Sequence, residues 1–132
     1  MTLVDSNVLV DLAAGDPRWA AWSGQALDMA AIRGPLCIND IVFAELSIGF
    51  DAIEDCEAFL ADLPVRLLPM PRPALFLAGR VFHAYRRRGG SRTGVLPDFL
   101  IGAHAAVAGL PLITRDVARY RTYFPRLDLI AP

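Results

Sequence analysis

The chain has 132 residues, of which 55% are hydrophobic and 20% charged, and its formal net charge is −1. This composition predicts one folded domain over residues 1–132 and excludes intrinsic disorder, and a charge so close to zero gives no global argument for nucleic-acid binding. All 13 basic residues are arginine, which excludes chemistry that needs a lysine amine, such as a Walker-type phosphate loop or a Schiff base.

No stretch of the chain reaches the ~20 apolar residues that a membrane helix needs, and Asp5 interrupts the apolar run that a signal peptide would require. The two cysteines, Cys37 and Cys56, form neither a CxxC pair nor a disulfide framework, which is typical of buried free thiols. We therefore expect a soluble cytoplasmic protein.

Short β-like runs alternate with longer helical runs along the chain. Strands are predicted at residues 2–5, 36–38, 66–68, 112–114 and 127–130. Helices are predicted at residues 6–14, 17–33, 41–49, 51–63, 72–88, 97–109 and 117–123. The expected helix starts are Asp16 with Pro17, Asn39 or Asp40, and a capping pair of Asp51 with Glu54. This alternation predicts an α/β fold, with a parallel sheet of four to five short strands flanked by helices and its chemistry at the carboxyl ends of the strands.

Most of the 14 acidic residues lie on polar helix faces or at helix starts, where solvation or capping explains them. Asp11 is expected to face outward from an apolar helix, and Asp128 outward from an edge strand. Four acids remain in apolar surroundings: Asp5, Glu45, Asp98 and Asp116. Two of them end strands, and the other two lie on apolar helix faces, with Glu45 beside Ile41 and Ile48. We expect these four acids to converge at one edge of the sheet.

Each of these acids also has a structural explanation. The helix dipole alone stabilises an acid at the position of Asp98, Asp116 is placed to cap the next helix, and Glu45 could pair with a buried arginine. All four together are better explained by a hard divalent cation, Mg²⁺ or Mn²⁺, of the kind that cleaves phosphodiesters. Because clustered carboxylates repel one another, we expect at least one to have a raised pKa without metal.

A basic segment follows the longest predicted helix, at Arg86, Arg87, Arg88 and Arg92. Arginines at a helix end are explained by solvation and the helix dipole, but the same residues are also candidates for RNA phosphate contacts. Trp19 and Trp22 are candidates for either the core or a partner surface. The sequence leaves both questions open.

The order of motifs DSNVLVDL, AEL, PDFLIGAHA and LITRD resembles that of PIN-domain ribonucleases, and most closely the VapC toxins of bacterial type II toxin–antitoxin pairs. The resemblance covers essentially the whole chain. It implies a single PIN-like domain and an endoribonuclease that inhibits translation and growth by cleaving RNA.

The resemblance also implies a set of site residues. Asp5, Glu45, Asp98 and Asp116 are expected to bind one or two Mg²⁺ or Mn²⁺ ions. Asn7 and Thr114 are the implied polar helpers, with Ser6 a weaker candidate. The implied partners are a second copy of the chain and a VapB-type antitoxin whose C-terminal segment occupies the groove. DNA would be contacted only through that antitoxin.

Three other functions deserve comparison. An aspartate-nucleophile phosphotransferase typically needs a second acid where this chain has Asn7, and also a lysine. A phosphoreceiver-like signalling module needs a lysine for the same reason. A catalytically silent PIN fold that acts only by binding would not need the four acids, which argues against it. Only a cleavage assay excludes it.

Overall fold

The computed structural model describes residues 1–132 and contains five short strands and seven helices. The strands are β1 (Thr2–Val4), β2 (Leu36–Ile38), β3 (Val65–Leu67), β4 (Leu112–Ile113) and β5 (Leu129–Ile130). The helices are α1 (Ser6–Ala14), α2 (Ala20–Arg33), α3 (Asp40–Ser47), α4 (Ile53–Ala61), α5 (Arg72–Arg87), α6 (Leu96–Ala108) and α7 (Ala118–Tyr123). The fold is therefore α/β, as the sequence predicts.

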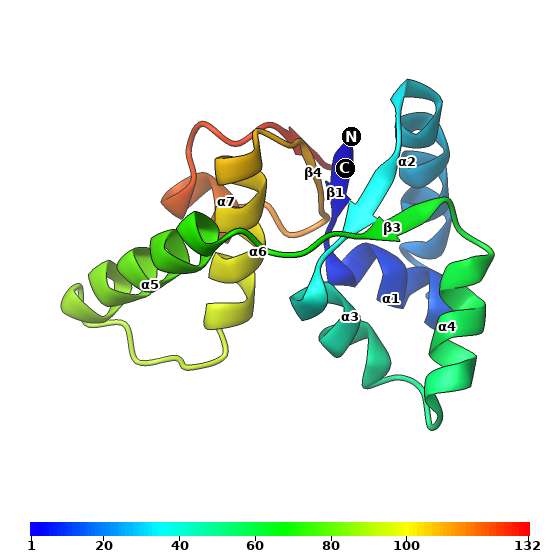
Figure 1. Ribbon diagram of the computed structural model, residues 1–132, viewed down its shortest axis with the longest axis horizontal. Coiled ribbons are helices and arrows are strands. Elements are labelled where there is room, and N and C mark those ends of the chain that lie inside the picture. Colours follow the sequence, from blue (N-terminus) through cyan, green and yellow to red (C-terminus); the bar gives the residue numbers. More distant parts are fainter.

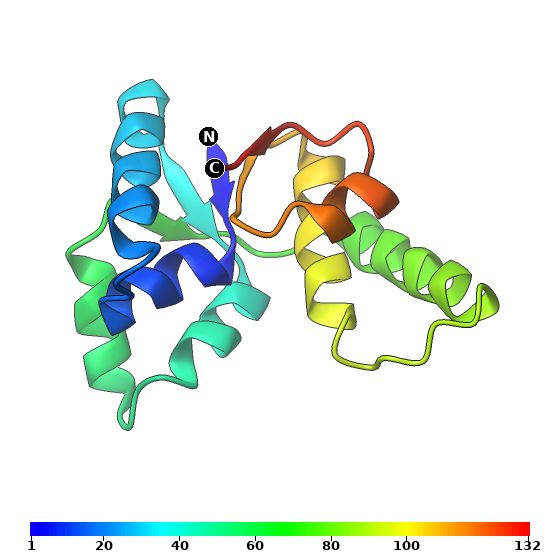
Figure 2. The ribbon, with the colours of Figure 1, turned by 180° about the vertical axis from the view of Figure 1, so that it is seen from behind.

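All five strands are parallel, and they form one sheet in the order β3-β2-β1-β4-β5. Figure 1 shows α5, α6 and α7 on one side of the strands and α1, α2 and α4 on the other, and Figure 2 shows the same layers from behind. Strand β1 lies in the middle, where Leu3 is in register with Cys37 on one neighbour and Leu112 on the other. Strands β1, β2 and β4 are buried along their whole length. Because helices cover both faces of such strands, their sequences are nearly continuous apolar runs.

Local sequence signals place several helix ends correctly. Gly15 and Gly109 end α1 and α6 in the left-handed region, with φ of 61° and 66°, where a residue without Cβ is least strained. Asn39 caps α3 by accepting a hydrogen bond from the backbone N–H of Val42 at 3.0 Å. The predicted bounds of α5 and α6 agree with the structure to within one residue.

Two predicted helix starts differ from the structure. Helix α2 begins at Ala20 because residues 17–19 form a turn, in which the Asp16 carboxylate accepts from the backbone N–H groups of Arg18 and Trp19 at 2.8 and 2.9 Å. Asp16 therefore performs the expected capping, but one turn ahead of the regular helix. The capping pair predicted for α4 is wrong, because the residue before that helix is Ala52 and makes no side-chain cap.

The two cysteines are buried and free, as predicted. None of the seven helices combines the length and the hydrophobicity that crossing a lipid bilayer requires. The hydrophobic cluster between sheet and helices includes Phe99 of α6, against which the rings of Phe82, Tyr85 and Tyr123 pack edge-on at 4.9 to 6.4 Å between centroids. This packing fixes α5 and α7 against α6, and so positions the residues that follow β4.

The close approach of Phe124 to α6 gives a test of this packing. A Cβ added to Gly102 would lie 2.5 Å from Cε2 of the buried Phe124 ring, so Gly102→Ala should lower the free energy of unfolding by about 1–3 kcal/mol. Gly79 in α5 is the matched control, since an added Cβ there meets nothing within 4 Å. Gly79→Ala should instead raise stability by up to about 1 kcal/mol through helix propensity. Urea denaturation measures both, and equal effects of the two changes would contradict the packing described.

Candidate functional site

A cleft of about 540 Å³ opens at the carboxyl edge of the sheet. Its walls are α1, the C-terminal half of α3 with the residues after it, the first turn of α6, and the segment that follows β4. The lining residues are Asp5, Ser6, Asn7, Val10, Ala13, Ala14, Glu45, Leu46, Ile48, Gly49, Phe50, Asp98 and Arg115. Three of the four acids singled out in the sequence therefore face one cavity, at the sheet edge where they were expected.

The carboxylate of Asp5 is held by donors from both ends of the chain. Asp5 caps α1, with Oδ1 accepting from the backbone N–H of Ser6 at 2.8 Å. Its other oxygen, Oδ2, accepts from Thr114 Oγ1 at 2.8 Å, from the Tyr120 hydroxyl at 3.0 Å and from Asn7 Nδ2 at 3.2 Å. Asn7 also donates to Thr114 Oγ1 at 3.2 Å. The orientation of this buried carboxylate is thus fixed by three side chains and the helix start.

Burial dominates the ionisation of Asp5. The pKa of its carboxyl group is raised from 3.8 to about 6, mainly by loss of solvent and in part by the nearby charge of Asp98, while the hydrogen bonds from Thr114 and Tyr120 act in the opposite direction. Burial, with the charge of Asp5 next to it, also raises the pKa of the Tyr120 hydroxyl well above its usual value. The expected raised pKa is therefore present, and burial contributes more to it than repulsion does.

Ser6 connects two of the acids. Its hydroxyl donates to Glu45 Oε1 at 2.7 Å and lies 3.4 Å from Asp5 Oδ1. Glu45 takes part in no ion pair, so the alternative of a buried arginine partner is wrong. The apolar face expected for Glu45 is not a core face either, because Ile48 is 85% exposed and lines the cleft.

Asp98 lies in the first turn of α6, where the helix dipole favours a negative charge. Its Oδ2 forms an ion pair with the guanidinium of Arg119 on α7, and both side chains are 25% exposed. Partial burial raises the pKa of Asp98, the charge and hydrogen bond of Arg119 oppose that rise, and the charge of Asp116 adds to it. Asp98 thus faces the cleft with a counter-ion already beside it.

Asp116 is the predicted acid that does not line the cleft. It is exposed, and its backbone N–H donates to Thr114 Oγ1 at 3.1 Å. It does not cap α7, because that helix starts after Val117 without a side-chain cap, so the capping alternative is wrong. Its charge is nevertheless near enough to act on the pKa of Asp98.

The carboxylate oxygens at this site are ligands of the type that a hard divalent cation prefers. In this structure, however, no three His, Cys, Asp or Glu side chains are grouped closely enough to hold an ion. Asp5, Glu45 and Asp98 offer only oxygen atoms, which Mg²⁺ and Mn²⁺ prefer. The repulsion between Asp5 and Asp98 across the cleft is what a bound cation would relieve. By donor type and charge the residues fit such an ion.

A second charged group beside the cleft is formed by Asp11 and Arg115. The prediction that Asp11 faces outward is wrong, because Asp11 is only 2% exposed. Its carboxylate accepts from Arg115 Nε at 2.7 Å, from Arg115 Nη2 at 3.0 Å and from Ser23 Oγ at 3.0 Å. The Arg115 guanidinium also stands over the ring of Trp19, 5.4 Å from its centroid. Asp11 therefore ties α1 to α2 through Ser23, and to the segment after β4 through an ion pair with the partly exposed Arg115.

The arginine segment at the end of α5 lies apart from the cleft. Arg86, Arg87, Arg88 and Arg92 are exposed, and none of them lines the cavity. Figure 1 shows the C-terminal end of α5 at the far left of the molecule, from which the following loop returns to the start of α6. Two of these guanidinium groups stack on aromatic rings, Arg86 over Phe82 and Arg88 over Tyr123.

Sequence reasoning missed Tyr120 and Arg119, which contact Asp5 and Asp98. Both lie on the short helix α7, directly after the last predicted acid. The signal that could have found them is position, because a helix that starts at the carboxyl edge of β4 carries its first turn past the site. Which side of that helix faces the cleft depends on the turn at residues 114–117, which no local pattern specifies.

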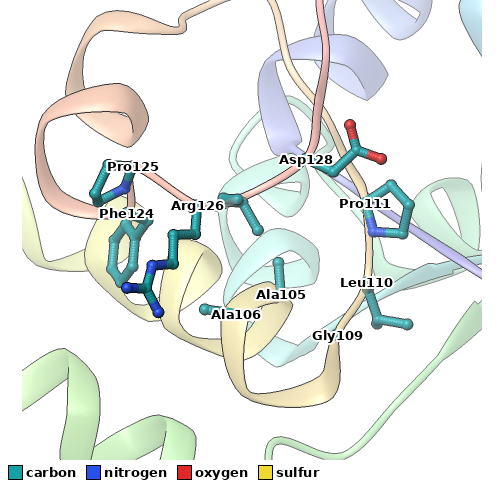
Figure 3. A pocket seen from close by; sticks show the side chains of 10 residues that line it. Ala105, Ala106, Gly109, Leu110, Pro111, Phe124, Pro125, Arg126 and Asp128 are labelled. Atoms are coloured by element: carbon teal, nitrogen blue, oxygen red, sulfur yellow. The ribbon is translucent and has the colours of Figure 1, made fainter.

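A separate cavity of about 480 Å³ lies between the end of α6 and residues 124–128 (Figure 3). Its walls contain alanine, proline, Leu110, Leu127 and Phe124, and its charged residues are Arg126 and Asp128. None of the predicted site residues lines it, so the cleft at Asp5 is the candidate site.

Known proteins share the sequence pattern and the fold of this chain. The family model described as "PIN domain" matches residues 2–125. Similar solved structures include VapBC2 from Rickettsia felis bound to a DNA fragment from its promoter, with a TM-score of 0.75, 20% identity and coverage of 98% of this chain and 97% of that one. VapBC-1 from nontypeable Haemophilus influenzae gives 0.71 and 18%, and FitAcB from Neisseria gonorrhoeae gives 0.70 and 19%, each covering 98% of this chain and 96% of the other. Comparison with curated protein sequences gives no match.

The raised pKa of Asp5 predicts how stability depends on pH. Because the folded-state pKa, about 6, exceeds the unfolded value of 3.8, the folded protein binds this proton more tightly, and stability is lost as pH rises towards and through 6. Asp5→Asn removes this titration. In EDTA, wild type should therefore lose about 2 kcal/mol relative to Asp5→Asn between about pH 4.5 and about pH 7.5.

Denaturant titrations at the two pH values measure this difference. Asp28→Asn, which removes an exposed carboxylate from α2, is the control and should follow wild type at both. A constant difference between wild type and Asp5→Asn would contradict the burial described for Asp5.

Proposed function

Because the chain belongs to the PIN-domain family, we propose that it is a metal-dependent endoribonuclease and the toxin of a toxin–antitoxin pair. The observation that carries this proposal is the cleft at the carboxyl edge of the sheet, where Asp5, Glu45 and Asp98 face one cavity. Carboxylates that repel one another in a partly dry cleft are costly to a fold, and such costs are typical of active sites.

In this proposal Asp5 and Asp98 are the principal ligands of Mg²⁺ or Mn²⁺, with Glu45 and Asp116 completing the acidic set. A bound ion of this kind polarises a phosphodiester and lowers the pKa of a coordinated water molecule. Asp116 contributes from the rim, since it is exposed and outside the lining of the cleft.

The neighbouring side chains prepare these acids. Thr114, Asn7 and Tyr120 direct their donors at Oδ2 of Asp5, so that the carboxylate keeps one orientation. Ser6 donates to Glu45 and prevents that longer side chain from turning out to solvent. Arg119 forms an ion pair with Asp98, which lowers the electrostatic repulsion among the acids of the cleft before an ion binds. Polar groups fixed in this way lose little freedom when the site is loaded.

The structural neighbours support an antitoxin as the protein partner. Several are complexes of a VapBC or FitAB pair, and some of these are bound to DNA. We propose that this chain likewise forms a homodimer, pairs with a VapB-type antitoxin and meets DNA only through it. RNA is the proposed substrate, and the cytoplasm, where RNA and antitoxin are made, is the proposed location.

Metal dependence is the first test of this function. Purified protein should cleave RNA with Mg²⁺ or Mn²⁺ and should stop when EDTA is added. Loss of a metal ligand forfeits several kcal/mol of transition-state stabilisation, so Asp98→Asn should lower the rate by at least ~100-fold. Gel analysis of a labelled RNA measures the rate. Undiminished cleavage in EDTA would contradict the mechanism, and an absence of cleavage by wild type would favour a silent PIN fold.

Growth arrest is the second test. Expression of the chain alone in bacteria should arrest growth, and Asp98→Asn should relieve the arrest because it removes a proposed ligand. Asp128→Asn is the matched control, since Asp128 is an exposed acid at the other cavity, and it should remain toxic. Colony counts after induction measure the effect. Equal toxicity of Asp98→Asn and wild type would place the activity elsewhere.

A further inference from the structure

The proposed site has an electrostatic problem with its proposed substrate. The charged residues that line the cleft are Asp5, Glu45, Asp98 and Arg115, three acids against one base. RNA carries a negative charge on every phosphate, so an acidic cleft repels it before and during binding. A substrate of this charge needs a cationic contact close to the acids, and the exposed arginines at the end of α5 do not reach the cleft.

Arg115 is unusual among the arginines in how firmly it is held. Asp11 receives two hydrogen bonds from its guanidinium, from Nε and Nη2, and the ring of Trp19 lies against the same group. A guanidinium has five N–H donors, so three remain without an acceptor in this structure. The side chain is 31% exposed and lines the cleft, so these donors have access to solvent there.

A purely structural role explains only part of this arrangement. The buried carboxylate of Asp11 needs a positive partner, and any cation within reach would satisfy it. That need does not explain why the partner stands in the wall of the cleft with most of its donors unused. Arg119, by comparison, lines no part of the cleft and is engaged with Asp98.

We propose that Arg115 binds a backbone phosphate of RNA in the cleft, and that Asp11 and Trp19 hold its guanidinium in place for this contact. The inference rests on the proposed ribonuclease function. Arginine presents a planar fork that suits phosphate oxygens, and a side chain fixed in advance loses little entropy on binding. Asp11 and Trp19 are positioning residues in this arrangement, since they act through Arg115.

The salt dependence of RNA binding distinguishes a phosphate contact from a structural role. Each phosphate neutralised on a single strand contributes about 0.7 to the slope of log Kd against log salt concentration, and a residue that only stabilises the fold contributes nothing. The measurement is fluorescence anisotropy of a labelled single-stranded RNA at several salt concentrations. It is made in EDTA, so that the RNA is not consumed.

The main variant is the double change Asp11→Asn with Arg115→Gln. It removes both charges of the pair together, so the net charge stays the same and no buried charge loses its partner. We expect the slope to fall by about 0.7 and Kd at low salt to rise roughly 5- to 10-fold. Asp11→Asn alone keeps the guanidinium and should keep the slope. Arg126→Gln, at an exposed arginine beside the other cavity, should also leave the slope unchanged.

If the double variant does not fold, Arg115→Lys provides a second test, which measures affinity and not the salt slope because lysine keeps the positive charge. An ammonium group still partners Asp11 but has no planar fork to offer a phosphate, so Kd should rise several-fold. Unchanged affinity and slope in a folded variant, with RNA cleavage by wild type intact, would overturn the role of Arg115 and leave the proposed function standing. The role of Arg115 is likewise overturned, and the proposed function left standing, if the salt slope is lowered by the triple change of Arg86, Arg87 and Arg88 to glutamine and not by the double change. Failure of wild type to cleave RNA with Mg²⁺ would overturn the proposed function itself and this inference with it.

Discussion

The burial of one carboxylate, that of Asp5, governs the arrangement of the whole site. Asp5 follows the central strand directly and is only 3% exposed, so its charge must be met largely by hydrogen-bond donors within the protein. Those donors come from α1, from the end of β4 and from α7, which brings Asn7, Thr114 and Tyr120 to the same oxygen atom. The segment after β4 is therefore shaped by Asp5, and the positions of Arg115 and Arg119 follow from that shape.

The fold could be predicted from the sequence because its signals are local. An apolar run, a capping asparagine or a glycine in the left-handed region carries its structural meaning wherever it occurs, which is why the sheet, α5 and α6 are placed correctly. The convergence of Asp5, Glu45 and Asp98 could also be predicted, because parallel strands and the helices between them bring their ends to one edge. The capping pair expected at Asp51 and Glu54 is absent because the residue before α4 is Ala52, whose side chain has no acceptor to offer the helix start.

The contacts that could not be predicted depend on tertiary geometry. Asp11 was expected to face solvent, and it is buried because Arg115, 104 residues later in the chain, reaches it with a bidentate ion pair. Tyr120 likewise meets Asp5 across a separation of 115 residues. In a chain without lysine, every such cation is an arginine, and arginine can serve two partners at once because its donors point in several directions. Spacing along the sequence carries no information about such pairings.

Because β1 lies in the middle of the sheet, the site can form only late during synthesis of the chain. The first strand is made first, yet one of its two neighbours is β4, and the carboxylate behind it waits for Thr114 and Tyr120. Until residues 112–120 have left the ribosome, the central strand has an unpaired edge and its acid has no donors beyond its own helix start. The cleft is therefore assembled only after residues 112–120 have emerged, and a shorter growing chain lacks the contacts that orient its central carboxylate.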